Sequence, residues 1–161
     1  MKLSAYTPER NRLVRRLWHL GGGSFFPVLS FFLPRGILLS LLGGACVLAL
    51  AWETVRFLRL GAGGWLMGYL RPLMKEQEVH RPTGTTYLLL SSLLVFWVVE
   101  PKLAALALLF QAVGDPAAAT VGERWGTGRI WGKSWQGSLA YLLSCLAVGG
   151  LLAVTGLGPG L

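Results

Sequence analysis

The chain has 161 residues, of which 53% are hydrophobic and only 14% are charged. Because a soluble domain carries about 25% charged residues, this composition argues against a water-soluble protein and predicts an integral membrane protein. The length leaves room for a single membrane domain over residues 1–161, and the net charge of +8 comes without the aromatic–basic module that nucleic-acid binding would need.

A basic N-terminal segment, residues 1–16, precedes the first apolar run. A cleaved signal peptide also begins this way, but the apolar sequence continues past Cys46, so we expect the N-terminus to be retained. Apolar runs along the chain predict an all-α, polytopic membrane helix bundle of about five transmembrane spans. They are Leu17–Leu33, Ile37–Phe57, Thr85–Val99, Leu103–Val121 and Leu139–Leu157.

The distribution of basic residues predicts the orientation of this bundle. If the N-terminus is cytoplasmic and the spans alternate, only Arg35 and Lys102 of the 15 Lys and Arg residues lie on the outer side. An excess of basic residues in cytoplasmic loops is typical of membrane proteins. We therefore expect the polar loops Glu53–Thr86 and Gly114–Gly137 to face the cytoplasm, at the inner membrane if the protein is bacterial.

Asp115, at the cytoplasmic end of the fourth predicted span, is the first candidate for a functional site. A carboxylate at that depth is costly and usually marks function. Pro116 follows it and removes a backbone donor, which favours a break or kink in a helix that lines a cavity. A carboxylate paired with a neighbouring arginine for folding alone is the alternative.

Other elements allow a structural and a functional interpretation. Glu53 and Arg56 are three residues apart and share one helix face, as in an ordinary intrahelical ion pair. His19 stands alone in "RRLWHL", where an interfacial role is the simpler interpretation. In "HRPTGTTY", Thr83 and Gly84 can cap the following helix or present donors to an anion at its N-terminus.

The stretch "GTGRIWGKSWQGS", residues 126–138, has the end of a phosphate-binding P-loop but not its first glycine, since Thr127 stands at that position. Its context is also span–loop–span instead of strand–loop–helix. The chemistry nevertheless suits a phosphate, because glycines permit close backbone approach, Lys133 is a point charge and Ser134 carries a hydroxyl. With Asp115 as a magnesium ligand, these residues predict a phosphoryl-transfer site of another kind.

The segment "GDPAAATVGERWGTGRIWGKSWQGSLA", Gly114–Ala140, resembles the signature of the CTP-dependent lipid-alcohol kinases, the family of dolichol kinase, phytol kinase and yeast-type diacylglycerol kinase. The matching residues are Gly114, Asp115, Ala118, Gly122, Gly126, Lys133, Ser134, Gly137 and Ser138. Three upstream stretches, "RRLWHL", "WETVR" and "RPTGTTY", resemble other elements of the family in the same order. One alternative is a phosphatidate cytidylyltransferase, whose signature half fits the same window. A non-catalytic membrane scaffold or transporter subunit is the alternative from another class.

The resemblance implies a kinase that transfers the γ-phosphate of CTP, with Mg²⁺ on Asp115, to the hydroxyl of a membrane lipid alcohol. That alcohol would be a polyprenol such as dolichol, a phytol-like alcohol or a diacylglycerol. Catalysis is expected from Asp115, Glu53 and His19, with His19 orienting the hydroxyl. Nucleotide binding is expected from Gly114, Gly122, Arg124, Gly126, Gly128, Lys133, Ser134, Gly137, Arg56, Thr83 and Gly84.

The resemblance also has a departure at its C-terminal end. Kinases of this family usually continue with another membrane pair and an acidic motif after the last span seen in this sequence. The expectation is therefore either a minimal member, completed by a second subunit, or a shortened chain of weak activity. A homo-oligomer is possible.

Overall fold

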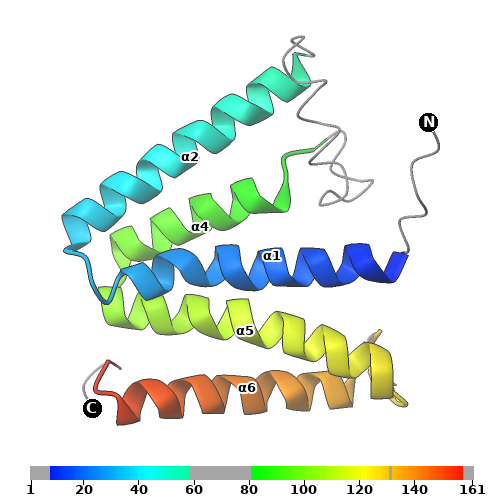
Figure 1. The fold of residues 1–161 in the computed structure, drawn as a ribbon. Coiled ribbons are helices and arrows are strands. Elements are labelled where there is room, and N and C mark those ends of the chain that lie inside the picture. Colours follow the sequence, from blue (N-terminus) through cyan, green and yellow to red (C-terminus); the bar gives the residue numbers. More distant parts are fainter. Residues whose placement is uncertain (1–7, 59–80, 131, 158–161) are drawn as a thin grey trace.

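The computed structural model describes residues 8–58, 81–130 and 132–157, and within these ranges it confirms an all-α protein (Figure 1). The predicted basic segment 1–16 and the predicted loop Glu53–Thr86 fall partly outside these ranges. The helices are α1 Pro8–Leu29, α2 Arg35–Phe57, α4 Gly84–Val98, α5 Pro101–Trp125 and α6 Trp135–Val154.

Three of these helices, α2, α5 and α6, are long and apolar enough to cross a membrane by length and composition. The apolar helix α4 has 15 residues, which at about 1.5 Å per residue is shorter than a hydrocarbon core of about 30 Å. The first predicted span lies largely within α1, which begins earlier, in the basic segment. The total of about five spans and the side of the N-terminus stay predictions.

Pro116 does not break the helix, because α5 continues from Pro101 to Trp125, and the alternative of a kink at Pro116 stays a prediction. A proline removes one bond of the helical ladder, whereas the alanines at positions 117–119 have the highest intrinsic helix propensity. Thr120 also donates its hydroxyl to the Pro116 carbonyl at 2.7 Å. The predicted loop Gly114–Gly137 is therefore the last turns of α5, a short hairpin and the start of α6.

Consecutive helices run in opposite directions, with α5 packed between α1 and α6, and α2 packed on α4 (Figure 1). The buried core lies where α2, α4 and α5 meet. It consists of Leu38, Leu42, Phe96, Ala104, Ala105 and Leu108. Other apolar side chains point outward, such as Leu48 on α2 and Val98 on α4, each 73% exposed. A surface this apolar suits contact with lipid.

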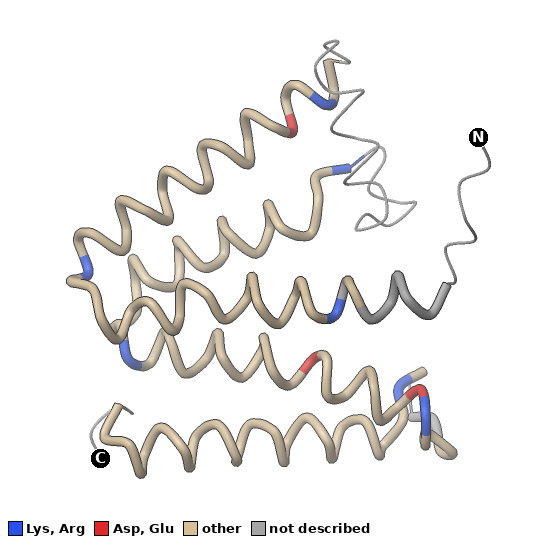
Figure 2. The backbone as a smooth tube through the Cα atoms, in the orientation of Figure 1, with Lys and Arg blue, Asp and Glu red and all other residues tan. Residues whose placement is uncertain are grey.

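Charged residues gather toward one end of the bundle (Figure 2). Arg56 lies in the last turn of α2 and Arg124 in the last turn of α5, whereas Arg35 and Lys102 lie at the opposite ends of the same helices. The alternating helices thus separate these residues as the predicted orientation requires.

Candidate active site

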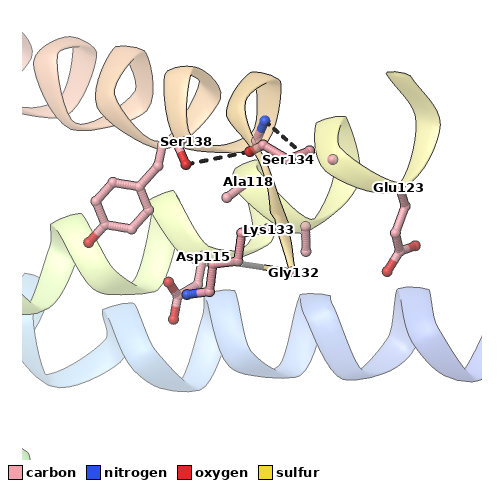
Figure 3. Close-up of a pocket in the computed structure, with 11 residues that line it drawn as sticks. Asp115, Ala118, Glu123, Gly132, Lys133, Ser134 and Ser138 are labelled. Atoms are coloured by element: carbon pink, nitrogen blue, oxygen red, sulfur yellow. Dashed lines mark hydrogen bonds between the residues drawn. The ribbon is translucent and has the colours of Figure 1, made fainter. Parts of the chain in front are cut away.

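A pocket of about 530 Å³ lies between α5, the hairpin and the first turns of α6 (Figure 3). This volume is within the range of small-molecule sites, about 300–1,000 Å³. The lining residues are Asp115, Ala118, Ala119, Gly122, Glu123, Gly132, Lys133, Ser134, Gly137, Ser138 and Tyr141. The pocket therefore brings Asp115 together with Lys133 and Ser134, although 17 residues lie between Asp115 and Lys133 in the sequence.

A short hairpin sets the positive side of the pocket. Strand β1, Arg129–Ile130, pairs antiparallel with β2, Lys133–Ser134, and Gly132 in the turn has a φ of +79°, which glycine adopts without strain. Helix α6 begins directly afterwards, and its N-cap Ser134 accepts a hydrogen bond from the Gly137 amide at 3.2 Å. Lys133 and the N-terminus of α6 thus lie side by side, and both favour an anion.

Asp115 supplies negative charge to the same pocket from α5. Its side chain is 55% exposed, and Figure 3 shows it in the same part of the pocket as Lys133. Over the described residues there is no group of three or more metal-binding side chains. Mg²⁺ does not need one, because it is commonly held by one or two carboxylates together with water and substrate phosphates. Asp115 is therefore suited to a magnesium–phosphate complex.

Two of the signature glycines let α5 and α6 approach each other around Ser134. A Cβ on Gly122 would lie 2.6 Å from the Ser134 hydroxyl oxygen, and one on Gly137 would lie 2.8 Å from the Ala118 carbonyl oxygen. A side chain at Gly137 would meet backbone and push the helices apart, whereas one at Gly122 would displace the Ser134 hydroxyl. Close helix packing is the structural use of both glycines, and direct contact with phosphate stays a prediction.

The other glycines of this segment predicted to bind nucleotide also lie against neighbouring side chains. A Cβ on Gly114 would lie 2.5 Å from the ring of Tyr141, which lines the pocket. At Gly126 it would lie 2.8 Å from Ser134 Cβ, and at Gly128 it would lie 3.1 Å from the Trp135 ring. Neither Gly126 nor Gly128 lines the pocket. Their predicted phosphate contacts are untested, and the structure accounts for them by packing.

Two residues of the stretch "RRLWHL" on α1, Arg16 and His19, face the carboxylates of α5. Arg16 forms an ion pair with Glu123, with Nη2 2.5 Å from Oε2, and its Nη1 lies 3.4 Å from the Thr120 hydroxyl. One turn further along α1, His19 Nε2 lies 3.9 Å from Asp115 Oδ2. The predicted catalytic pair His19 and Asp115 is thus brought together by the packing of α1 on α5.

Glu53 belongs to a second, separate cluster that joins α2 to the start of α4. Its Oε1 accepts hydrogen bonds from the Thr83 amide at 2.6 Å and the Thr86 hydroxyl at 2.9 Å. Its Oε2 accepts from Arg56 Nε at 2.9 Å and also from Arg56 Nη2. The same guanidinium donates to the Arg81 carbonyl at 2.7 Å. Glu53 and Arg56 are buried, at 4% and 7% exposure.

In the folded chain, donors of the "TGTT" stretch bind an anion of the protein itself, the Glu53 carboxylate. Glu53, Arg56 and Thr83 do not line the pocket of Asp115, and Gly84 lines a different one. A carboxylate with four donors has few lone pairs left for proton transfer, which favours a structural role. Catalysis by Glu53 and phosphate binding by Arg56, Thr83 and Gly84 stay predictions.

The remaining predicted cation, Arg124, lies at the end of α5 with its guanidinium 5.8 Å from the centre of the Trp125 ring. Arg124 does not line the pocket. Of the cations predicted to bind phosphate, Lys133 does line it.

Two charged residues of the site were missed from the sequence. Glu123 follows Asp115 by eight residues, so both fall on nearly the same face of a helix, and this spacing could have found it. Arg16 was part of the orientation signal and of the "RRLWHL" resemblance, but it was given no role at the site.

Comparison with known proteins agrees with the resemblance seen in the signature. The chain is 39% identical to a curated phytol kinase of Synechocystis sp. over 97 residues, which is 54% of this chain and 42% of that relative. The match thus spans less than half the length of the relative. No protein-family model matches the chain, and no solved structure matches it significantly. The similarity agrees with the kinase resemblance of the signature and favours neither the cytidylyltransferase nor the non-catalytic alternative.

Proposed function

We propose that this protein is a membrane kinase that transfers the γ-phosphate of a nucleoside triphosphate, most simply CTP, to the hydroxyl of a lipid alcohol. The observation that carries this proposal is the pocket in which Asp115 faces Lys133 and the N-terminus of α6. Phosphoryl transfer depends mainly on positioning and on neutralising charge, and this pocket offers one group for a metal and two for phosphate. The similarity to a phytol kinase supports the same class of acceptor.

Each group has a separate task in the proposed reaction. Lys133 binds the phosphate oxygens beside the positive end of the α6 dipole, while the Ser134 hydroxyl accepts from the Gly137 amide and so fixes the start of the helix. Asp115 would hold Mg²⁺, which when bound neutralises and orients the phosphates. Arg16 pairs with Glu123, which also lines the pocket, and so limits the negative charge there.

The bond changes balance without any further reactant. The acceptor oxygen forms a bond to the γ-phosphorus, and the bond from that phosphorus to the β–γ bridging oxygen breaks. The products are a lipid monophosphate and a nucleoside diphosphate. The hydroxyl proton passes to a base, for which His19 and Asp115 are the candidates, because they lie 3.9 Å apart beside the pocket.

The test is transfer of radiolabel by purified protein in lipid bilayers, with Mg²⁺, a panel of lipid alcohols and, in a separate arm, phosphatidate. CTP labelled at the γ-phosphate is compared with CTP labelled at the α-phosphate and with γ-labelled ATP. The kinase transfers γ-label alone, and the ATP arm identifies the nucleotide. Transfer of α-label to phosphatidate would instead establish a cytidylyltransferase.

A binding measurement separates a catalyst from a non-catalytic subunit. A ligand at 100 times its dissociation constant stabilises the folded state by about 2.7 kcal/mol, so Mg²⁺ with CTP should raise the unfolding temperature. Lys133→Ala should abolish this increase. Protein that shows neither transfer nor nucleotide-dependent stabilisation would contradict the proposal.

A further inference from the structure

A second pocket, of about 190 Å³, lies between α1 and the first turns of α4. Its walls are mainly apolar and come from Trp18, Gly22, Phe25, Phe26, Leu88 and Leu89. His19, Gly84 and Thr85 contribute the polar part. The Trp18 indole nitrogen lies 3.4 Å from the Thr85 hydroxyl, so the two helices also meet across this pocket. None of these residues lines the pocket of Asp115 and Lys133.

His19 connects this second pocket with the proposed phosphate site. Its ring lines the α1–α4 pocket, while its Nε2 lies 3.9 Å from Asp115 Oδ2, which belongs to the first pocket. That Nε2 atom is buried and has no hydrogen-bond partner among the described residues, and 3.9 Å is too long for a bond to Asp115. A buried nitrogen without a partner is costly, so a hydroxyl group beside His19 would satisfy it.

The surroundings of the pocket match one end of a lipid. Trp18 and Phe25 are 54% and 59% exposed on the outer face of α1, so the apolar walls continue onto the surface. Tryptophan is typical of the membrane–water interface, the depth at which a lipid hydroxyl lies. At about 30 Å³ for a water-sized group, 190 Å³ holds roughly six such groups. That suffices for a hydroxymethyl group and the first carbons of a single chain, but not for a glycerol with two ester groups.

We infer that the α1–α4 pocket binds the hydroxyl end of a single-chain lipid alcohol, with His19 receiving the hydroxyl and Phe25, Phe26, Leu88 and Leu89 enclosing the first carbons of the chain. This inference rests on the proposed kinase activity and specifies its acceptor site. The alcohol reaches the site from the bilayer, and the nucleotide occupies the other side of the His19–Asp115 contact. Diacylglycerol is a poor acceptor because its branched head exceeds the pocket.

Two adjacent glycines of α1 allow a matched test. Neither Gly21 nor Gly22 has an atom within 4 Å of an added Cβ, but only Gly22 lines the pocket. Gly22→Leu should raise the KM for a C20 isoprenoid alcohol about tenfold or more, the cost of a misfit in an apolar pocket. Gly21→Leu should leave that KM unchanged. Both variants should keep the wild-type increase in unfolding temperature with Mg²⁺ and CTP, which shows that they fold and bind nucleotide.

Photo-crosslinking of the wild-type protein supplies a readout that does not depend on turnover. A C20 alcohol with a diazirine near its hydroxyl should label peptides from 8–29 and 84–98. If phosphoryl transfer occurs but the label lies on other helices, or if both glycine variants keep the wild-type KM, the inference is wrong and the kinase stands. If no alcohol is phosphorylated, the proposed function fails. Label on α1 and α4 would then still establish the pocket as an alcohol site. Without that label, both the inference and the proposed function would be overturned.

Discussion

Asp115 has two neighbours: Lys133, which lines the same pocket, and His19, which lies on α1. A carboxylate in that position can hold a metal ion and influence a proton on the imidazole at the same time. Its exposure of 55% shows that it is open to a ligand and is not buried in a structural ion pair. The folding-only alternative for Asp115 is therefore disfavoured, since the neighbouring arginine, Arg16, pairs with Glu123.

Replacement of this carboxylate by an amide tests its role at the level of a single charge. Asp115→Asn should lower kcat by at least about 100-fold, because it removes the charge that would hold Mg²⁺ opposite the phosphates. The measurement is γ-label transfer at saturating alcohol. Glu100→Gln changes the N-cap carboxylate at the other end of α5, outside the pocket, and should keep wild-type kcat. Undiminished turnover in Asp115→Asn would exclude it from catalysis.

At the scale of helices, the site depends on how closely α5 and α6 pack. The glycines of the signature lie at this contact, and Ser134 is held between Gly122 and Gly137. A motif that was interpreted from the sequence as a phosphate cradle is, in the fold, mainly a contact between two helices. The phosphate-binding groups, Lys133 and the start of α6, are positioned by that contact.

A methyl group at this contact should therefore be destabilising. Gly137→Ala should lower the free energy of unfolding by about 1–3 kcal/mol, the usual cost of overpacking, and should weaken nucleotide binding. Gly43→Ala is the control, because a Cβ there meets nothing within 4 Å and alanine favours a helix by about 1 kcal/mol. Denaturant or thermal unfolding in detergent measures both. A stable Gly137→Ala protein would show that α6 can move away without loss.

The Glu53 cluster is the other contact between elements that makes a distinct prediction. Glu53→Gln leaves the buried Arg56 without its counter-charge, so the free energy of unfolding should fall by about 3–5 kcal/mol. Activity per folded molecule should stay near wild type if the cluster joins α2 to α4. Thr54→Ala, on an exposed face of the same helix, serves as the comparison. A catalytic Glu53 would instead give a folded protein without turnover.

At the scale of the whole molecule, charged residues gather toward one end of the bundle, and the sides of the bundle are apolar. Figure 2 shows the charged residues near the ends of the helices, apart from Asp115 in the body of α5 and Arg16 in α1. The first pocket lies toward the end that carries Arg124 and Lys133. With the N-terminus inside, that pocket opens to the compartment that contains nucleotides.

Cysteine labelling in intact bacterial cells tests this orientation. In a background with Cys46 and Cys145 replaced by alanine, Lys102→Cys should react with an impermeant thiol reagent from outside. Arg124→Cys, at the opposite end of α5, should react only after the cells are permeabilised. The reverse pattern would place the proposed active site outside and would remove its source of CTP.

Much of this protein could be predicted from its sequence, because the signals are local. Long apolar runs fix where helices form, basic residues at alternate ends fix which ends lie together, and the order of Gly114, Asp115, Lys133 and Ser134 indicates phosphate chemistry. The boundaries of α2 and α4 lie within two residues of the predicted spans. The continuity of α5 through Pro116 was not predicted, since a single missing hydrogen bond is weaker than the surrounding alanine-rich helix.

Only the tertiary structure decided which of the candidate residues share a site. Sequence spacing cannot tell that His19 faces Asp115 while Glu53 faces Thr83, because each contact joins helices far apart in the chain. The role of the glycines also depends on packing, since a missing side chain has meaning only against the neighbour that fills the space. Helices are specified by nearby residues, whereas pockets are specified by the way helices pack, which depends on side chains from the whole chain.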